Sequence, residues 1–286
     1  MNSSLRFSIV TPSLNQGAYL SEALLSVRNQ RPAPLEHLVM DGGSQDRSLE
    51  ILRRHSMDGS GHLHWRSESD RGQSHALNKG FLLAKGEIVG WLNSDDRYRS
   101  GCFEAVKKAF ADYPEADIIY GDYTWIDERG RLLRTRREIE FNYFVLLYHR
   151  VLYIPTTATF FRRQIFQEGN LLDERLRFAM DYEFFLRLAI RGYHFQHIPV
   201  VLADFRFHRE SKSCTMPEKQ LQEQNHVMQM YSPILRKRAS SWARGVVFTA
   251  LRLAAAAVRY SEKMIRGYYF DRLRRSTVAW QRRCTF

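Results

Sequence analysis

The chain has 286 residues and a mass of 33.7 kDa, of which 44% are hydrophobic and 13% aromatic. This composition supports a full apolar core and exceeds one average domain, so we expect a main domain with an appendage. Three scattered cysteines, Cys102, Cys214 and Cys284, argue against a disulfide framework and against a thiolate metal site. The first residues lack a signal-peptide pattern, which predicts a cytoplasmic protein.

The net charge of +12 is concentrated at the C-terminal end. From Arg236 to Phe286 there are 13 Lys or Arg residues against Glu262 and Asp271, whereas the first 235 residues hold 30 basic and 29 acidic residues. The sequence therefore predicts a nearly neutral main domain over residues 1–215 and a basic helical extension over residues 216–286.

Short apolar runs alternate with helical patterns in the first half of the chain. We expect strands at residues 5–10, 35–40, 62–68 and 87–92, with helices at residues 18–30, 46–55 and 72–85. Strands separated by helices of this length form parallel pairs through right-handed crossovers. The predicted class is α/β, with a mainly parallel central sheet flanked by helices.

The second half continues with further elements. We expect a helix near residues 102–113, a strand, turn and strand over residues 117–133, a strand near residues 157–163, a helix at residues 180–192, and a late strand from residue 197. The late strand carries His208 at its end.

Polar residues follow three of the early strands. Thr11 and Pro12 end the first, Asp41 ends the second, and Asn93 to Asp96 follow the fourth. Ligands of open α/β sheets bind beyond the carboxyl ends of the strands. These residues are therefore expected to face one cleft.

Asp95 and Asp96 are adjacent, and two neighbouring carboxylates repel unless they are solvated or share a cation. Oxygen ligands without a nearby cysteine suit Mg²⁺ or Mn²⁺, which commonly bridge carboxylates and substrate phosphates. A solvated turn or a helix N-cap is the alternative interpretation.

Four segments occur in the order TPSLNQGAYLSEALLSVRNQ, VMDGGSQDRS, SDRGQSHALNKG and GEIVGWLNSDDRY. Over roughly Phe7 to Ser213 the sequence resembles the family 2 glycosyltransferases of the GT-A fold. The resemblance implies an inverting enzyme of the bacterial cell-surface polysaccharide type, with residues 1–215 as its catalytic domain.

By this resemblance, Asp96 would bind a Mn²⁺ or Mg²⁺ ion directly, and Asp95 would lie near the ribose of the donor or a metal-bound water. Asn93 stands where the family often has another acid. In FRFHRESKS, His208 would approach the metal or the diphosphate, unless it is a structural histidine. Arg206 and Lys212 of the same segment would help to neutralise phosphate.

The resemblance also implies contacts to the nucleotide-sugar donor. Asp41 would accept a hydrogen bond from the base, and Thr11 and Pro12 would line the same pocket. Arg71 and Asn78 would contact the donor before and within the third helix. An Asx turn is the structural interpretation for Asp41 and can hold together with the base contact, and a surface ion pair is the alternative for Arg71.

The segment ERLRFAMDYEFFLRLA resembles the family's catalytic helix. It implies Asp181 as the general base, with Met180 replacing the preceding glutamate of many members. A carboxylate within hydrogen-bond reach can take the proton of an acceptor hydroxyl. Glu183 lies about 200° around the helix from Asp181, which favours a packing or solvent role. Helix capping is the alternative for Asp181.

The basic extension contains a 14-residue apolar run, GVVFTALRLAAAAV, which is too short to span a bilayer. The sequence MIRGYYFDRLRRSTVAWQRR then mixes aromatic residues with arginines, which favours an amphipathic helix on an anionic membrane surface. The alternative is a helix that packs on the domain and leaves a solvated basic face. Nucleic-acid binding is disfavoured because no binding motif accompanies the charge.

Together these features imply a metal-dependent, inverting glycosyltransferase. Its donor would be a nucleotide-diphosphate sugar, with UDP the expected nucleotide, and its acceptor a hydroxyl of a saccharide or a lipid-linked molecule. The enzyme would be cytoplasmic and peripheral on the cytoplasmic face of the membrane. Alternatives are a noncatalytic sugar-nucleotide or membrane-binding protein of the same fold, and a nucleotidyltransferase. A dinucleotide oxidoreductase is excluded because no G-x-G-x-x-G follows the first strand.

Overall fold

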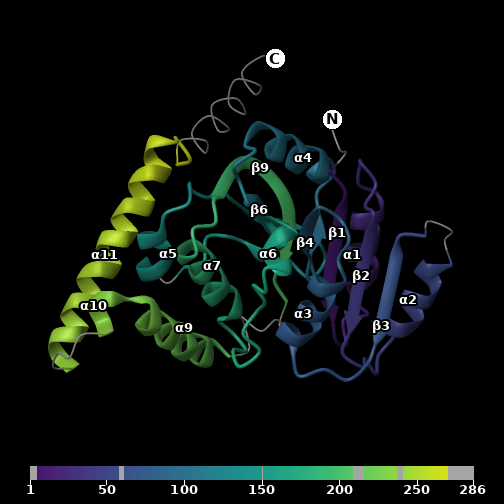
Figure 1. Ribbon diagram of the computed structural model, residues 1–286, viewed down its shortest axis with the longest axis horizontal. Coiled ribbons are helices and arrows are strands. Elements are labelled where there is room, and N and C mark those ends of the chain that lie inside the picture. Colours follow the sequence, from purple (N-terminus) through teal and green to yellow (C-terminus); the bar gives the residue numbers. More distant parts are fainter. Residues whose placement is uncertain (1–4, 58–60, 150, 209–215, 237–240, 270–286) are drawn as a thin grey trace, which may run out of the picture.

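The computed structural model describes residues 5–57, 61–149, 151–208, 216–236 and 241–269. The strands in these ranges form one sheet at the centre of the molecule (Figure 1). They are β1 (Phe7–Ser13), β2 (Glu36–Asp41), β3 (Leu63–Ser67), β4 (Ile88–Trp91), β5 (Arg97–Tyr98), β6 (Ile118–Ile126), β7 (Leu132–Arg136), β8 (Thr159–Arg162) and β9 (Phe195–Arg206).

The strand order is β3-β2-β1-β4-β8-β6-β9-β5, with β7 beside β6. β1, β2, β3 and β4 pair in parallel, as do β6 and β9, whereas β8 is antiparallel to both of its neighbours. The remaining pairs, β5 with β9 and β6 with β7, are also antiparallel. The predicted α/β sheet is confirmed, and the expected parallel crossovers form its first half, while the later strands make it mixed.

Helices cover both faces of the sheet (Figure 1). The helices that precede residue 216 are α1 (Leu20–Arg28), α2 (Ser48–Ser56), α3 (Gln73–Leu83), α4 (Cys102–Asp112), α5 (Tyr143–His149), the 3₁₀ turn η1 (Thr156–Ala158), α6 (Gln164–Gln167) and α7 (Met180–Ile190). Buried residues of α3, α5, α6 and α7 share one core cluster, and those of α1 and α4 share another. The two clusters lie on opposite faces of the sheet.

The first strands have apolar centres flanked by polar residues, and they are buried on both faces. Every residue of β1, β2 and β4 is buried, as is typical of parallel strands covered by helices on each side. Gly80 lets α3 approach β1 closely, since a Cβ atom there would lie 2.3 Å from Val10 Cγ1. This close packing fixes the N-terminal end of α3 beside the carboxyl end of β1.

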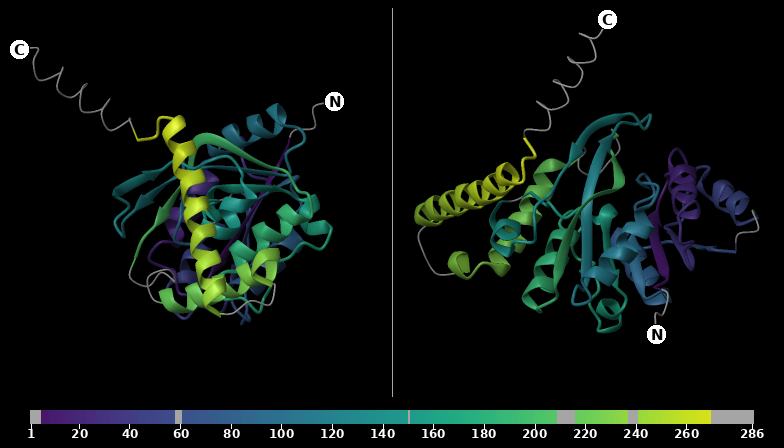
Figure 2. Two further views of the ribbon diagram at one scale, coloured as in Figure 1. Left: turned by 90° about the vertical axis from the view of Figure 1, so that its left-hand side faces the viewer. Right: turned by 90° about the horizontal axis from the view of Figure 1, so that it is seen from above.

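The described part of the C-terminal extension contains α9 (Pro217–Tyr231), α10 (Pro233–Arg236) and α11 (Ser241–Ile265). Figure 2 shows α11 running along the outside of the molecule. In the described ranges, no helix combines the length and apolarity that crossing a membrane requires. Most of the predicted membrane-binding segment, from residue 270 onward, lies outside the described residues.

α11 docks through buried charges. Arg259 Nη2 lies 2.5 Å and Lys263 Nζ 2.9 Å from Glu138 Oε2, and all three side chains are buried. Burial lowers the pKa of Lys263 to about 8. Ala255 on the same side of the helix is fully buried. Packing of this helix on the domain is therefore observed, but Arg259 and Lys263 face inward and do not contribute to a solvated basic face.

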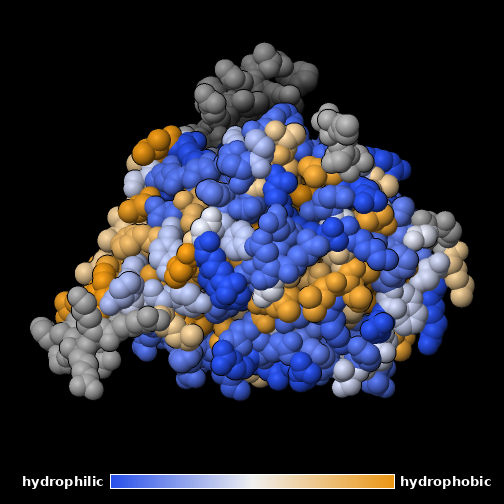
Figure 3. Space-filling view, viewed as in Figure 1, coloured by the Kyte–Doolittle hydropathy of each residue, from blue (hydrophilic) through white to orange (hydrophobic). Residues whose placement is uncertain are grey.

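The opposite side of α11 is apolar and exposed. Its large exposed hydrophobic residues are Val246, Val247, Leu253, Val258, Tyr260, Met264 and Ile265. Apolar surface gathers along this helix at the left of the molecule in Figure 3. We call these seven side chains the outer face of α11. α11 thus exposes its apolar stripe and buries Arg259 and Lys263, whereas an ordinary surface helix buries its apolar stripe and exposes its charges.

Candidate active site

A cleft of about 390 Å³ opens at the carboxyl ends of β1 and β4. Its volume lies within the range of about 300–1,000 Å³ that small-molecule sites occupy. The cleft is lined by Pro12, Ser13, Leu14, Gln16, Asp70, Gly72, Gln73, Ala76, Trp91, Asn93, Ser94, Asp95, Thr156, Arg177, Phe178, Met180, Asp181, Phe205, His208 and Gln220. The structure therefore brings together the predicted residues Pro12, Asp95, Asp181 and His208.

Asp95 and His208 form a pair in the cleft wall. His208 Nε2 lies 2.9 Å from Asp95 Oδ2, with side-chain exposures of 2% and 22%. The ring of Tyr19 packs against the imidazole, with centroids 5.0 Å apart. The end of β9 is thereby attached to the loop after β4, and a carboxylate and an imidazole face the same space.

Asp96 lies directly behind this pair and is only 1% exposed. Its Oδ1 accepts a hydrogen bond from the backbone N–H of Arg206 at 2.9 Å, and its Oδ2 accepts one from Asn93 Nδ2 at 3.1 Å. Burial, reinforced by the Asp95 carboxylate, raises the pKa of Asp96 well above its ordinary value. Asp95 therefore lines the cleft, whereas Asp96 is buried. The sequence predicted that Asp96 would bind the metal ion directly.

Arg206 has a structural role, and the prediction that it neutralises phosphate is corrected. Its side chain is fully buried. Nε donates to the backbone oxygen of Asp95 at 2.8 Å, Nη1 donates to the backbone oxygen of Glu128 at 3.1 Å, and Nη2 pairs with Glu22 Oε2 at 2.8 Å. These contacts attach the loop after β4, residues 93–96, to its neighbours, and we call this loop the acidic loop. Lys212, assigned the same role, lies outside the described residues.

Of the two residues predicted at the end of β1, only Pro12 lines the cleft. Thr11 is fully buried, and its Oγ1 lies 2.9 Å from Nε2 of His37 on β2. Burial lowers the pKa of His37 to about 3, so its imidazole is neutral. The expectation that Thr11 contacts the donor is corrected because its hydroxyl is engaged within the sheet.

Asp41 forms the Asx turn, which is compatible with the contact to the base that the resemblance implies. It is 2% exposed, and its Oδ2 accepts hydrogen bonds from the N–H groups of Gly43 and Ser44 at 3.1 and 2.9 Å and from Ser67 Oγ at 2.6 Å. Ser44 Oγ donates to Oδ1 at 2.5 Å. With four hydrogen bonds already accepted, the carboxylate holds the loop after β2 and does not line the cleft.

Arg71 and Asn78 meet at Glu174, and neither lines the cleft, although Asp70 and Gly72 on either side of Arg71 do. Arg71 Nη2 lies 2.6 Å from Glu174 Oε2, and the Arg71 side chain is 70% exposed. Asn78 Nδ2 donates to the backbone oxygen of Leu172 at 3.0 Å, and Asn78 Oδ1 accepts from the Leu172 N–H at 2.9 Å. Arg71 thus forms a surface ion pair in place of the predicted donor contact. Asn78 hydrogen-bonds the backbone of Leu172 and so connects α3 to the loop after α6.

Arg177 is the cation that sequence reasoning missed. Among the described residues that line the cleft it is the sole Arg or Lys. Its guanidinium lies over Gly72, where a Cβ atom would come within 2.3 Å of Nη1, and Gly72 has a φ of +120°. The available signal was its position four residues before Asp181, in the segment that carries the catalytic resemblance.

Asp181 lies in the first turn of α7 and lines the cleft. Its Oδ1 accepts the backbone N–H of Tyr182 at 2.8 Å. Glu183 is 5% exposed and pairs with Arg187 at 2.8 Å, while Tyr231 donates to its Oε1 at 2.6 Å. Asp181 is thus the carboxylate of this turn that faces the cleft, and Glu183 packs inside as predicted.

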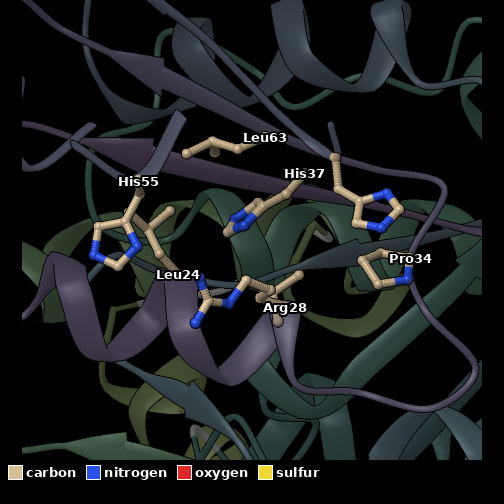
Figure 4. Close-up of a pocket in the computed structure, with 8 residues that line it drawn as sticks. Leu24, Arg28, Pro34, His37, His55 and Leu63 are labelled. Carbon is tan, nitrogen blue, oxygen red and sulfur yellow. The ribbon is translucent and has the colours of Figure 1, made fainter. Parts of the chain in front are cut away.

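A second, much smaller cavity lies between α1, β2 and β3. It measures about 20 Å³ and is lined by His37, His55 and His62, among others; this is room for about one water molecule. Figure 4 shows His37 and His55 pointing into it. Within the described residues no three His, Cys, Asp or Glu side chains are grouped so that they could hold a metal ion. The larger cleft is therefore the candidate active site.

Comparison with curated proteins identifies glycosyltransferases. The chain is 30% identical over 182 residues to a PGL/p-HBAD biosynthesis glycosyltransferase of Mycobacterium bovis, covering 63% of this chain and 68% of the relative. It is 31% identical over 196 residues to an uncharacterised glycosyltransferase of Mycobacterium tuberculosis, covering 66% of this chain and 71% of the relative.

Two kinds of solved structure share the fold. Staphylococcus aureus TarS 1–349 in complex with UDP-GlcNAc is 17% identical, with a TM-score of 0.64 over 86% of this chain and 71% of that one. The mannosyltransferase PcManGT from Pyrobaculum calidifontis, in complex with GDP-Man and Mn²⁺, is 17% identical, with a TM-score of 0.61 over 90% of this chain and 74% of that one. The model of glycosyl transferase family 2 matches residues 8–169. The chain therefore belongs to glycosyl transferase family 2, with the α/β architecture of the GT-A glycosyltransferases.

Proposed function

We propose that the protein transfers a sugar from a nucleotide-diphosphate sugar to a hydroxyl group of an acceptor, with inversion at the anomeric carbon. The observation that carries this proposal is that one cleft is lined by the Asp95–His208 pair and also by Asp181. A site for the diphosphate and a carboxylate that can act as base are thereby available to one bound donor and acceptor.

The acidic loop fits a divalent cation, Mn²⁺ or Mg²⁺. Asp95 and His208 offer an oxygen and a nitrogen at the cleft wall. Burial, and then the neighbouring Asp95 carboxylate, raise the pKa of Asp96, and a nearby cation would offset the second effect. Asp95 and His208 would hold the ion, with diphosphate oxygens and water as its other ligands. Asp96 is buried, and the described residues contain no group of three His, Cys, Asp or Glu side chains that could hold a metal ion, so Asp96 would act on the ion through the loop it shares with Asp95. A bound cation would supply positive charge that stabilises the departing diphosphate.

The chain's own residues would perform the remaining steps. Asp181 accepts the proton of the acceptor hydroxyl while the acceptor oxygen bonds to the anomeric carbon. The bond from that carbon to the diphosphate oxygen breaks, and the nucleoside diphosphate leaves. Arg177 supplies a forked donor for the negative charge of the diphosphate. With Asp181 as the base and no nucleophile assigned, direct displacement inverts the anomeric configuration.

UDP is the proposed nucleotide, and a saccharide or lipid-linked molecule is the proposed acceptor. A solved relative of the fold binds UDP-GlcNAc, while another binds GDP-Man, so dTDP and GDP sugars belong in any test. We propose a lipid-linked acceptor in cell-surface polysaccharide or glycolipid synthesis. The exposed apolar outer face of α11 supports this proposal, because it could hold the enzyme at a lipid surface.

We also propose that the outer face of α11 rests on an anionic membrane surface on its cytoplasmic side. Two observations support this occupant. The outer face is apolar and exposed, and the sequence around the helix is strongly basic, with five arginines among residues 270–286 against Asp271. Apolar anchoring together with cationic attraction is the pattern of interfacial helices.

The test of the transferase proposal is a panel of UDP, dTDP and GDP sugars incubated with the purified chain and Mn²⁺, with released products identified by chromatography. Release of nucleoside diphosphate from one sugar nucleotide supports it. Release of pyrophosphate from a nucleoside triphosphate and a sugar phosphate would instead indicate a nucleotidyltransferase. Binding of a sugar nucleotide without any release, even with cell lipid extract added as acceptor, would indicate a noncatalytic protein.

A further inference from the structure

Glu223 of α9 binds the chain segment that leads into Asp181. Its Oε2 accepts hydrogen bonds from three consecutive backbone N–H groups, those of Arg177 at 3.0 Å, Phe178 at 2.7 Å and Ala179 at 3.0 Å. Its Oε1 accepts a further bond from the Arg177 N–H at 3.1 Å. One carboxylate therefore holds three successive peptide units.

This segment is part of the cleft wall and the start of the catalytic helix. The side chains of Arg177 and Phe178 line the cleft, and Ala179 is the N-cap residue of α7. Alanine has no side-chain acceptor for the free N–H groups at a helix N-terminus. Glu223 instead accepts from the N–H groups of the residues that lead into the helix, up to and including the N-cap residue Ala179, and its negative charge interacts favourably with the positive end of the helix dipole.

A second contact fixes α9 along α7. Tyr231, the last residue of α9, donates to Glu183 Oε1 at 2.6 Å, and Val227 and Met228 between Glu223 and Tyr231 are buried. Gln220 of α9 also lines the cleft. α9 is therefore held against α7 and the segment before it by contacts near its middle and at its C-terminal end, so Glu223 can determine where the segment before Asp181 lies.

We propose that Glu223 is a positioning residue for catalysis: it holds the segment Arg177–Ala179 so that Asp181 and Arg177 face the bound substrates. This proposal rests on the proposed transfer reaction, in which Asp181 is the base. It assigns the start of the C-terminal extension to the active site, whereas the sequence suggested a separate extension from residue 216. Glu223 acts through the backbone and touches no reacting atom.

The test compares Glu223→Gln with Glu218→Gln, a matched change at an exposed carboxylate of the same helix. Glutamine keeps the size of the side chain but removes the charge that strengthens the three hydrogen bonds. Because a displacement of about 1 Å can cost roughly a hundredfold in rate, we expect kcat of Glu223→Gln to fall about tenfold to a hundredfold. Because the same segment carries Arg177, KM for the donor should rise as well, whereas the Mn²⁺ dependence of nucleotide binding should persist, since the loop that holds Asp95 is untouched. Glu218→Gln should match the wild type.

Hydrogen exchange provides a readout that does not depend on the reaction. The amides of Arg177, Phe178 and Ala179 should exchange at least tenfold faster in Glu223→Gln, with exchange in β1 and β4 unchanged. If Glu223→Gln does not fold, Glu223→Asp keeps the charge but shortens the reach, and it should show the same local effect. Unchanged exchange at residues 177–179, or wild-type kcat in a folded variant, would overturn the proposal. A wild-type enzyme that transfers no sugar would contradict the proposed function alone, since the exchange result still decides the role of Glu223 in holding the segment.

Discussion

His208 Nε2 and Asp95 Oδ2 lie 2.9 Å apart although 113 residues separate them in the sequence. The contact arises because β9 is parallel to β6 and ends beside the loop that follows β4. The last strand of the sheet thus completes a site begun by the first ones. This geometry explains why a histidine after a late strand and an acidic pair after an early one can serve the same ligand.

Asp95→Asn should weaken Mn²⁺-dependent nucleotide binding at least tenfold. The substitution keeps the shape of the side chain but removes the charge nearest to His208, and a divalent cation prefers a carboxylate oxygen to an amide oxygen. The measurement is a thermal-shift titration with Mn²⁺ and UDP. Asp112→Asn, a change at a surface ion pair on α4, provides the control. Equal Mn²⁺ response in wild type and Asp95→Asn would show that Asp95 does not hold the metal.

Asp181→Asn should lower the rate of sugar transfer by about 10²–10⁴-fold, the usual contribution of a general base. Nucleotide affinity should be unchanged, because the acidic loop and Arg177 are intact. Single-turnover kinetics and equilibrium binding would separate these two quantities. Asp173→Asn, which removes a carboxylate paired with Arg175 at the surface, is the matched control. Near-normal turnover of Asp181→Asn would require another base.

Arg177→Ala should reduce donor affinity about tenfold, whereas Arg71→Ala should change it less than twofold. Arg177 lines the cleft, and charge-assisted hydrogen bonds to a diphosphate contribute about 1.5–3 kcal/mol. Arg71 is instead paired with Glu174 at an exposed position, where an ion pair contributes little. Calorimetric titration with the nucleotide distinguishes the two. The reverse ranking would restore the prediction made from the sequence and reject the assignment of Arg177.

Replacing Leu253 and Met264 together by glutamate should reduce co-sedimentation with phosphatidylglycerol-rich vesicles at least tenfold. These side chains are 66% and 59% exposed on the outer face of α11, and burying each contributes about 1.5–3 kcal/mol. The matched control replaces Leu132 and Leu133, exposed leucines on β7, by glutamate. The membrane proposal fails if the wild type does not bind such vesicles. It also fails if the outer-face variant instead abolishes a concentration-dependent dimer in light scattering.

His37 should make the fold acid-sensitive. Its folded pKa of about 3 lies below the ordinary value of 6.5, so the unfolded chain binds more protons between these pH values. The free energy of unfolding therefore falls as the pH drops through this window, by about 2 kcal/mol between pH 7 and pH 5 from this residue. His37→Gln should lose that part of the dependence in urea unfolding, whereas His64→Gln, on the exposed side of β3, should retain it. Parallel pH dependence of His37→Gln and wild type would reject this account.

The sequence predicts the elements well where their patterns are local. The helices and the strands β1 to β4 that precede α4 lie within a few residues of their expected positions, because apolar runs and helical spacing follow directly from burial on one or both faces. The short strand β5 was not predicted, and the short helix α5 was missed, since residues 141–155 are mostly apolar or aromatic and carry no clear periodicity. Position in the sheet likewise brings Pro12, Asp95 and His208 to one edge.

The direction of individual polar side chains could not be predicted in the same way. Arg71 turns to Glu174, 103 residues away, and Thr11 turns to His37 across a strand pair. Such partners are chosen by tertiary packing, which a motif does not encode. Glu223 shows the converse: nothing in the sequence of α9 marks a residue that reaches the catalytic segment, because its role depends on how α9 packs against α7.

The most direct test of a metal-dependent nucleotide-sugar site is calorimetric titration of UDP, dTDP and GDP into the wild-type protein, once with Mn²⁺ and once with EDTA. The account predicts that one nucleotide binds at one site per chain with Mn²⁺ and that its affinity drops at least tenfold with EDTA. Binding of equal strength with EDTA would contradict the role assigned to Asp95, Asp96 and His208. Absence of binding by all three nucleotides would contradict the assignment of the cleft itself.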